Sequence, residues 1–511
     1  MSKKLLRSML TMLLAATLLI AAGCQNVGDL NLNEALSKSL KVQSVESKQS
    51  IALEIDLNEK YEATAEVTDV MQLFSKVKLD ITHAKADKDG NASVDGTIYF
   101  ADKAGIKFSM QMNAKVMAFQ IDGAKQPFYL PLDLDAEEFS EEEIAEANKL
   151  QLQITELIGK FIIEKLPSPD GLAVQPVKDT VNGESLSLMQ VSAEVDGEQL
   201  LTLLTQFVDN LLKDEAGFKV VITEVIKLVM ENPLFAEEMA LMSSDEELDQ
   251  PNVDDIAKEL SDTLFEFLVE MRKEMGDSIT TESIGSILKK VLHAKVDLFL
   301  DKELQTRKQH AEINVNLGKY KEFKDMPFHA IRLKSTSESW NMGGNVKVDK
   351  PYKPAESIEL SELDYMEGFE VLQLFDNKSE LYSILKNNFH ITKQTYHGFL
   401  EEYEGAPVIM PGNITLVSLR DIADYFGGEL KYDKKSKTVT YNDIATNTVI
   451  KVTFGSKIAE VNGKKVEWRY PTINIDGYGY VDARNLANAL GASIKWGDDY
   501  GFKLLTIERE L

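Results

Sequence analysis

Apolar and polar residues alternate in several segments near the start of the chain. The alternation is clearest at residues 51–57, 77–81, 106–112 and 117–121. A period of two predicts β-strands with one buried face, because successive side chains of a strand point to opposite sides of the sheet. Turn-forming residues separate these segments at positions 87–91, 95–96 and 122–123. We therefore expect an antiparallel meander with one apolar face.

The pattern changes to a helical period in the middle of the chain. Residues 135–166 predict a helix with Ser140 and Glu143 spaced as a capping box. After a strand predicted at 185–195, Asp196 and Gly197 begin a helix with one apolar face. The apolar residues of that helix are Leu200, Leu201, Leu204, Phe207, Val208, Leu211 and Leu212. Further helices are predicted at 218–232, 253–276 and 280–294, with an exposed acidic connection at 243–252.

Alternating segments return after the helices, at 294–303, 310–318 and 329–338. Strands, then a block of helices, then strands again predict an α+β fold in which one sheet closes around or over the helices. Residues 25–45 are small and polar, and we expect them to form a tether. Residues 351–404 contain Pro351 and Pro354 followed by an acidic helical piece, which predicts a linker with a helix.

The first 24 residues have the layout of a secretion signal. Basic residues precede an apolar run over 9–22, and this run is shorter than the roughly 20 residues that a transmembrane helix needs. Its ending resembles the lipobox of bacterial lipoproteins, with Ala21 where leucine is more usual. The resemblance implies cleavage between Gly23 and Cys24 and a diacylglycerol on Cys24. An uncleaved anchor and an ordinary signal peptidase site are the alternatives.

The order of elements over 46–350, in a lipoprotein setting, resembles the half-open barrel of lipoprotein carriers such as LolA and the LppX-like group. The resemblance implies a curved antiparallel sheet that holds helices, and sometimes lipid, on its concave side. Met110, Met112 and Met117 in the predicted strands favour an apolar ligand there, although methionines suit an ordinary filled core equally well.

The C-terminal part of the chain contains an internal repeat. Residues 415–433 match residues 479–497 at an offset of 64 positions. Identical pairs are Val417 and Val481, Arg420 and Arg484, Ala423 and Ala487, Gly427 and Gly491, and Lys431 and Lys495. Each copy predicts a strand, a short helix that ends at a left-handed glycine, and a second strand. Between the copies, Asn462 and Gly463 predict a hairpin turn.

These repeats resemble the copper amine oxidase N-terminal-like family, also called stalk domains. The pattern L-V-x-L-R-x-I-A-x-x-x-G stands at 416–427, and G-S-x-x-x-x-V-N-G stands at 455–463. Asp482 and Ala483 replace a more usual proline–leucine pair in the second copy. The resemblance implies one small α+β domain of a kind common on surface proteins of Gram-positive bacteria. Copper amine oxidase catalysis belongs to a separate domain with histidine-bound copper, and no histidine follows His397, so we do not expect this activity.

Composition narrows the classes of function. The chain has 511 residues, 44% of them hydrophobic, which is enough for several packed cores. Its formal charge is −27, or −30 once the leader with its three basic residues is removed, so we expect no nucleic-acid binding. Cys24 is the only cysteine, which excludes an intrachain disulfide and a cysteine-based zinc or redox site.

Three sets of residues are weighed as candidate sites. His293, His310 and His329 stand near predicted strand starts and either converge on a metal or lie exposed singly. A possible calcium loop consists of Asp87, Asp89, Asn91, Ser93 and Asp95, but Ala92 and Ile98 occupy its required glycine and glutamate positions, so a hairpin turn is favoured. A cluster of aromatic residues in the last domain is expected either to stack on sugars or to fill the core: Trp468, Tyr470, Tyr478, Tyr480, Trp496, Tyr500 and Phe502.

The sequence thus predicts a five-part α+β chain. Its parts are a signal peptide (1–23), a lipidated tether (24–45), a curved-sheet domain with a helical insertion (46–350), a linker with a helix (351–404) and a stalk domain (405–511). We expect a non-enzymatic lipoprotein on the extracellular face of the membrane, with a cell-wall or protein partner and with no cofactor or metal. A carrier for a lipid or another apolar ligand is the alternative.

Overall fold

The computed structural model of the protein describes residues 26–27, 30–101, 103–132, 141–230, 232, 253–280, 289–318, 320, 323–348, 357–400, 405–499 and 502–511. The chain divides into two compact units, of which the first contains the residues up to 122 and 126–360 and the second contains 123–125 and 361–511. Cys24 and the predicted leader lie outside the described residues. No described helix is long and apolar enough to cross a membrane.

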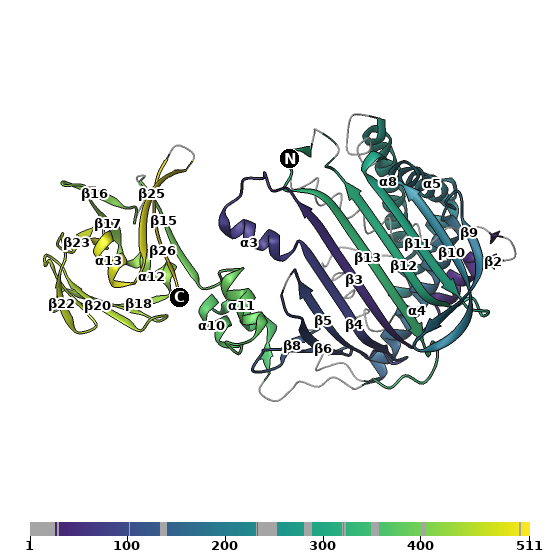
Figure 1. Ribbon diagram of the computed structural model, residues 1–511, viewed down its shortest axis with the longest axis horizontal. Coiled ribbons are helices and arrows are strands. Elements are labelled where there is room, and N and C mark those ends of the chain that lie inside the picture. The colour runs from purple at the N-terminus through teal and green to yellow at the C-terminus, as the bar shows by residue number, and fades with distance from the viewer. Residues whose placement is uncertain are drawn as a thin grey trace. The chain divides into compact units, whose positions relative to one another are not determined.

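The first unit is built on one sheet of twelve strands (Figure 1). In spatial order these are β14 (Ile358–Glu359), β8 (Phe128–Pro131), β7 (Val116–Ile121), β6 (Ile106–Met112), β5 (Ala92–Phe100), β4 (Lys76–Ala86), β3 (Val45–Leu57), β13 (Phe328–Trp340), β12 (Thr306–Asn316), β11 (Leu292–Leu300), β10 (Glu184–Asp196) and β9 (Ala173–Val181). Neighbouring strands are antiparallel except β14 and β8, which are parallel. The strands predicted before and after the helical block meet where β3 pairs with β13.

One face of this sheet is apolar across seven neighbouring strands, from β10 to β5. A single row of directly paired residues consists of Val195, Ala294, Ile313, Leu333, Leu53, Val77 and Phe100. Directly opposed residues in a sheet share a face, so the separate alternating segments of the sequence combine into one continuous apolar surface.

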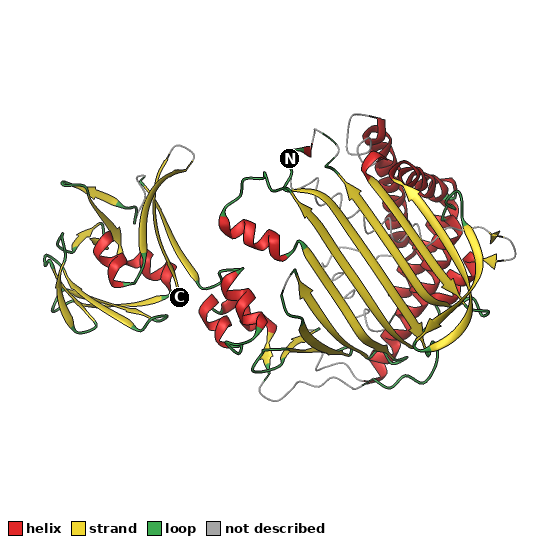
Figure 2. Ribbon diagram, viewed as in Figure 1, coloured by secondary structure: helices red, strands yellow, loops and turns green. Residues whose placement is uncertain are grey.

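Helices cover the β9–β13 end of the sheet (Figure 2). They are α4 (Glu141–Lys165), α5 (Gly197–Lys213), α6 (Glu215–Met230) and α8 (Val253–Thr280). Leu200 and Leu201 of α5 pack with Val195, Ala294 and Ile313 in a buried core. The predicted α+β fold class, with a large antiparallel sheet and a helical block, is therefore confirmed.

The start of α5 was predicted correctly from its local sequence. The Asp196 carboxylate accepts a hydrogen bond from the backbone N–H of Gln199 at 2.9 Å, and the Gln199 side chain accepts one from the N–H of Asp196 at 3.0 Å. This reciprocal cap satisfies two N–H groups that a helix start leaves free. Ser140 of the other predicted capping box and the connection at 243–252 lie outside the described residues.

The turn expected at Asp95 and Gly96 is absent, because both residues lie inside β5. This strand pairs with β4 on one side and with β6 on the other. Gly96 lies opposite Phe108, and a Cβ atom on Gly96 would be only 2.6 Å from the Phe108 ring. Gly96 therefore makes room for an aromatic side chain on the neighbouring strand. The turn was predicted because an Asp-Gly pair is also typical of turns.

Part of the expected tether belongs to the first unit. Helix α2 (Leu32–Ser39) is capped by the Asn31 side chain, which accepts a hydrogen bond from the N–H of Glu34 at 3.1 Å. Leu32 and Ala35 are buried and pack in one cluster with Val191 and Leu300 of the sheet. A short helix with an apolar face gains its stability from such packing, which the small and polar composition did not suggest.

The second unit contains three sheets around two short helices. The first sheet has the strand order β15 (Lys393–Phe399), β26 (Phe502–Glu510) and β25 (Ser493–Asp499). The second has the order β16 (Val408–Met410), β17 (Ile414–Ser418), β24 (Tyr478–Asp482) and β23 (Ile473–Ile475). The third has the order β18 (Gly428–Asp433), β19 (Thr438–Asp443), β20 (Thr448–Thr453), β21 (Ile458–Val461) and β22 (Lys464–Glu467). The helices are α12 (Leu419–Phe426) and α13 (Ala483–Ala489).

The two repeats form one core, as the sequence predicted. Ile422 and Phe426 of α12 pack in the same buried cluster as Leu486 of α13. Gly427 and Gly491 follow these helices with φ of 67° and 68°, the left-handed conformation that glycine adopts without steric cost.

The described residues 361–400 belong to this second unit and form helices and a strand rather than only a linker. A 3₁₀-helix (Leu360–Tyr365) is followed by α10 (Gly368–Gln373), α11 (Glu380–Asn387) and β15. Strand β15 pairs with β26, and Tyr396 of β15 is buried in the core of the two repeats. The unit therefore starts earlier in the chain than the expected boundary at 405.

Candidate functional site

The apolar face of the large sheet differs in burial between its two ends. At the β10–β12 end, Val195, Ala294 and Val315 are each no more than 1% exposed. At the β3–β7 end, Ile106 is buried but several other residues that continue the same face remain partly exposed: Leu53, Leu79, Met110, Met112, Met117 and Phe119. Partly exposed apolar side chains on a sheet are a candidate surface for an apolar ligand.

The three methionines that the sequence singled out lie together on this surface. Met110 on β6 is opposite Phe119 on β7, and Met112 is opposite Met117. Methionine side chains are flexible and polarizable, so such a cluster can adapt to apolar ligands of different shape. The register of β6 and β7, which no single segment reveals, creates the cluster.

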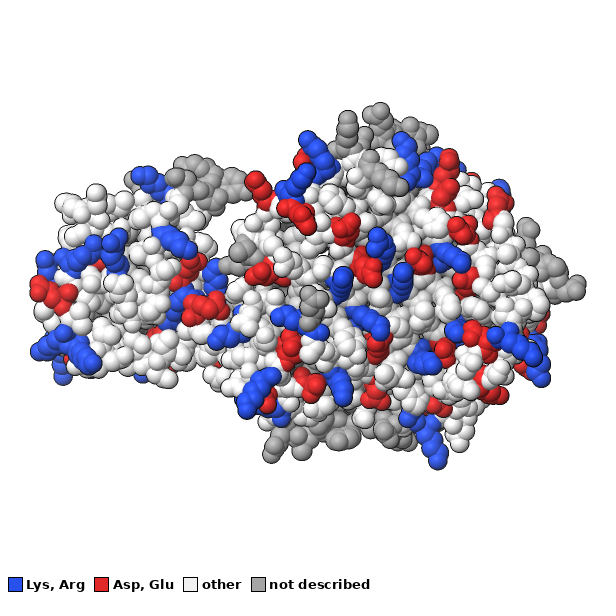
Figure 3. Space-filling model, viewed as in Figure 1, with Lys and Arg blue, Asp and Glu red and all other residues white. Residues whose placement is uncertain are grey.

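The opposite face of the large sheet carries many charged side chains, with a small buried apolar cluster of Val181, Leu188 and Phe299 at its β9–β11 end. Figure 3 shows Lys and Arg side chains interspersed with Asp and Glu over the strands of the first unit. One ion pair, 2.9 Å between Lys48 and Glu338, bridges the neighbouring strands β3 and β13, and another, 2.9 Å between Lys308 and Asp179, joins β12 to β9. The hydrogen bond from Lys308 is the main cause that lowers the pKa of the Asp179 carboxyl. A face of this kind is suited to water rather than to an apolar ligand.

The three candidate histidines do not converge on a metal site. His293 lies 2.9 Å from the Glu194 carboxylate, whereas the His310 ring packs against Phe299 with 5.1 Å between centroids. Burial lowers the pKa of His310. Within the described residues, no group of three or more His, Cys, Asp or Glu side chains is arranged to hold a metal ion.

The possible calcium loop is a hairpin turn between β4 and β5. The Asp87 carboxylate accepts hydrogen bonds from the backbone N–H groups of Asp89 and Asn91, at 2.9 and 3.0 Å, and from the Asn91 amide at 2.9 Å. These bonds hold the turn with the very oxygens that a calcium ion would need. The hairpin interpretation is confirmed.

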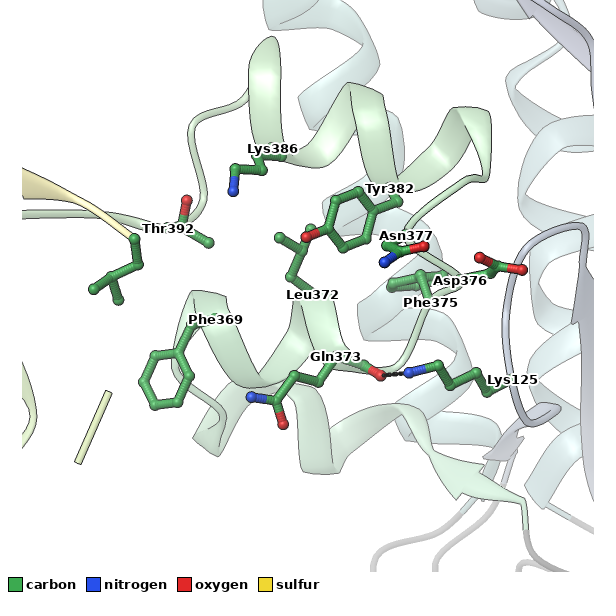
Figure 4. Close-up of a pocket in the computed structure, with 11 residues that line it drawn as sticks. Lys125, Phe369, Leu372, Gln373, Phe375, Asp376, Asn377, Tyr382, Lys386 and Thr392 are labelled. Atoms are coloured by element: carbon green, nitrogen blue, oxygen red, sulfur yellow. Dashed lines mark hydrogen bonds between the residues drawn. The ribbon is translucent and has the colours of Figure 1, made fainter. Parts of the chain in front are cut away.

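An open pocket of about 530 Å³ lies beside α10 and α11 in the second unit (Figure 4). Phe369, Leu372 and Tyr382 supply apolar surface, while the Lys125 ammonium donates to the Gln373 carbonyl at 2.7 Å. The Asp376 carboxylate accepts a hydrogen bond from the backbone N–H of Lys378 at 3.0 Å. The charged groups of Lys125 and Asp376 are thus engaged in hydrogen bonds to nearby backbone. We therefore interpret the pocket as part of the packing around α10 and α11 rather than as a ligand site.

A buried ion pair holds the core of the second unit. Arg509 on β26 donates two hydrogen bonds to the Asp443 carboxylate, at 2.6 and 2.8 Å, and both side chains are almost inaccessible to water. The same guanidinium lies within 3.4 Å of the Phe426 carbonyl and 3.5 Å of the Leu490 carbonyl. These carbonyls lie at the ends of the two repeat helices, where a cation is favourable. The spacing of residues along the chain did not suggest this pair.

A comparison with known protein families found a match in the C-terminal unit. Residues 397–502 match the copper amine oxidase N-terminal domain family. No curated protein matches the chain. The match begins within β15, in agreement with the pairing of β15 and β26 in one sheet. The family resemblance of the repeats is therefore confirmed, although it concerns only this part of the chain.

The structure shows why Asp482 can replace the more usual residue at the start of the second repeat helix. Asp482 caps α13 by accepting hydrogen bonds from the N–H groups of Arg484 and Asn485, at 3.0 and 3.1 Å. Its two oxygens also accept bonds of 2.8 Å from Arg469. Ser418 caps α12 at the matched position of the first repeat, so both copies keep a helix cap with different side chains.

The match gives no support to amine oxidase chemistry. The matched family is the N-terminal domain of copper amine oxidases, and it points to an accessory role rather than to a catalytic one. The sequence contains no histidine after His397 that could bind copper in this domain.

The aromatic residues of this domain divide between core and surface. Trp468 and Tyr480 are buried, each 3% exposed, whereas Trp496 is 45% exposed. Tyr478 lines a surface groove together with Tyr432 and Phe454, two aromatics that the sequence had not singled out. Tyr500 and the Phe502 side chain lie outside the described residues. The core interpretation therefore holds for some of these residues only.

Proposed function

We propose that the protein is a non-enzymatic lipoprotein, anchored through a diacylglycerol on Cys24, whose C-terminal unit binds a partner at the extracellular face of the membrane. The observation that carries this proposal is the match of residues 397–502 to an accessory domain, in a chain that begins with a lipobox-like leader. Two acyl chains supply a stable anchor, at about 0.8 kcal/mol for each buried CH₂.

Cys24→Ala is expected to abolish anchoring through a diacylglycerol. Without the thiol, no thioether to diacylglycerol forms, and the net charge of the chain offers no attraction to anionic lipid. The measurement is detergent phase partitioning of cell fractions, with mass spectrometry of the mature N-terminal peptide. The wild type should carry the diacylglycerol mass, and the variant should be found in the medium or as unprocessed precursor.

Gln25→Ala is the matched control for this experiment, because it changes the neighbouring residue and leaves the thiol. It should partition as the wild type does. A Cys24→Ala protein that is still cleaved and still membrane-bound would show that the anchor proposal is wrong.

A second candidate function is that of a carrier for a lipid or another apolar ligand. The partly exposed apolar positions of β3–β7 favour it, since Val195, Ala294 and Val315 on the same face are buried at the β10–β12 end. An acyl chain laid across Met110, Met112 and Phe119 would remove this surface from water at about 25 cal/mol per Å². The ion-paired opposite face offers no such gain.

Ligand extraction tests the carrier. The chain from Gln25 onward, which lacks the lipidated cysteine, is purified and extracted with organic solvent for mass spectrometry. We expect an acyl lipid in roughly equimolar amount, and a loss of at least about half of it in Met110→Gln. Ser109→Gln on the opposite face is the matched control and should retain the lipid. Recovery of no lipid from the wild-type chain would exclude the carrier function.

A further inference from the structure

A groove of about 500 Å³ lies on the surface of the copper amine oxidase N-terminal-like domain. Residues of α12, β18 and β19, of β23, β24 and the turn between them, and Phe454 after β20 line it. Leu430 and Val439 pack against the core of the domain from within the groove. Segments far apart in the sequence thus form a concave surface of the size that ligand sites have.

Aromatic side chains stand along this groove. Tyr432 on β18 is 53% exposed, and its ring meets the ring of Phe454 edge-on, with 5.9 Å between centroids. The Arg420 guanidinium lies over the ring of Tyr478 at 5.2 Å. Exposed aromatic surface is unfavourable in water, so a ligand that covers Tyr432 with C–H groups would gain free energy.

Hydrogen-bonding groups accompany these rings. Across the described chain, the side chains of Arg420 and Asp424 make no hydrogen bond and no ion pair, although both line the groove. The Asn474 side chain accepts a hydrogen bond from the N–H of Gly477 at 3.2 Å, which leaves its amide N–H₂ group to donate. The groove therefore offers a cationic donor, an anionic acceptor and an amide donor beside aromatic faces.

This combination selects one class of ligand. An acyl chain would bury Arg420 and Asp424 without partners, which is costly. A nucleic acid would bring its phosphate groups against the Asp424 carboxylate in the groove, which repels them. A pyranose ring has an apolar C–H face that stacks on an aromatic ring, and its edge carries hydroxyl groups that both donate and accept hydrogen bonds. It satisfies the rings and the polar groups at once.

The domain as a whole is suited to a polymer of such rings. Trp496, which matches Tyr432 in the second repeat, is 45% exposed, so an aromatic contact is available on each repeat. Residues 405–511 contain 14 Lys and Arg against 13 Asp and Glu, whereas the full chain has a formal charge of −27. The excess negative charge thus lies elsewhere, and the domain does not repel an anionic wall polymer.

We propose that this groove binds a polysaccharide of pyranose sugars, with a ring stacked on Tyr432 and hydroxyl groups held by Arg420, Asp424 and Asn474. This names the partner class of the proposed surface lipoprotein and rests on that function for its access to glycans. Binding is measured on purified protein, so a negative result here leaves the outcome of the Cys24 experiment unaffected.

The test uses the full lipidated chain in detergent micelles. Sedimentation with insoluble peptidoglycan and with chitin, and calorimetric titration with chitohexaose and cellohexaose, measure the affinity for glycans. We expect saturable binding to at least one of these four probes. Tyr432→Ala should weaken it about tenfold, whereas Tyr432→Phe, which keeps the ring, should stay within about threefold of the wild type.

Tyr425→Ala is the matched control, since Tyr425 lies on α12 outside the groove and is 54% exposed, close to the value for Tyr432. It should bind glycans as the wild type does. Asp424→Asn provides a second variant with little risk to folding and should also weaken binding, because it removes the charged acceptor. Absence of binding to all four glycans, or equal losses in Tyr432→Ala and Tyr425→Ala, would overturn the proposal.

Discussion

Asp443→Ala is expected to lower the free energy of unfolding of the C-terminal unit by about 3–5 kcal/mol. The substitution would leave the Arg509 guanidinium buried without its counter-charge, while its two hydrogen bonds of 2.6 and 2.8 Å to the carboxylate are lost. Arg509 also stands beside the carbonyls that end both repeat helices. A displaced guanidinium therefore disturbs the junction of the two repeats as well as the ion pair.

Hydrogen–deuterium exchange of peptides from the second unit measures this effect separately from the first unit. The double variant Asp443→Leu with Arg509→Met should recover much of the loss, because an apolar pair leaves no uncompensated charge. Lys451→Ala is the control, since its pair with Glu460 at 3.1 Å is partly exposed to solvent and contributes less than about 1 kcal/mol. A loss below about 1 kcal/mol in Asp443→Ala would contradict the assigned role.

Leu292→Ala in the first unit is expected to cost about 2–5 kcal/mol, whereas Leu79→Ala should cost only about 1 kcal/mol. Both leucines lie on strands of the large sheet. Leu292 is 5% exposed and packs in the core beneath α5, so its removal leaves a cavity. Leu79 lies at the partly exposed β3–β7 end, where its side chain has lost less contact with water on folding.

Exchange of peptides from β11 and β4 measures both variants against the same unfolding reaction. The comparison matters for function as well as stability. If Leu79→Ala cost as much as Leu292→Ala, the β3–β7 end would be packed like an ordinary core, and the carrier candidate would lose the observation that favours it. A small cost at Leu79 would leave this surface available to a ligand.

Local patterns predicted much of the fold. Alternation located β3, β4, β6 and β7, and the capping residues at Asp196 located the start of α5, because these signals act between residues that are close in the chain. Strand β9 and helix α2 were missed, since their stability comes from packing on β10 and α4 rather than from local pattern. Gly96 was misassigned because its partner, Phe108, lies on another strand.

The candidate sites were harder to predict than the elements. The methionine cluster needed the register of β6 against β7, although its members were named from the sequence. The groove with Tyr432, Phe454 and Tyr478 was not foreseen, because its walls come from distant segments. Trp468 and Trp496 carry the same sequence signal, yet one is buried and the other exposed. Whether a tryptophan is buried depends on the packing of the whole domain, so it cannot be predicted from the residue type alone.

The sequence by itself determined the α+β class, the lipobox-like leader that ends at Cys24, and the repeat with its two left-handed glycines. Each depends on residues within one helix, strand or short motif. Only the tertiary structure decided that β3 pairs with β13, that Arg509 meets Asp443, and which aromatic side chains remain in water. Those outcomes depend on contacts between residues far apart in the chain. Such contacts form only when long loops close and whole sheets and helices pack together, so local patterns do not reveal them.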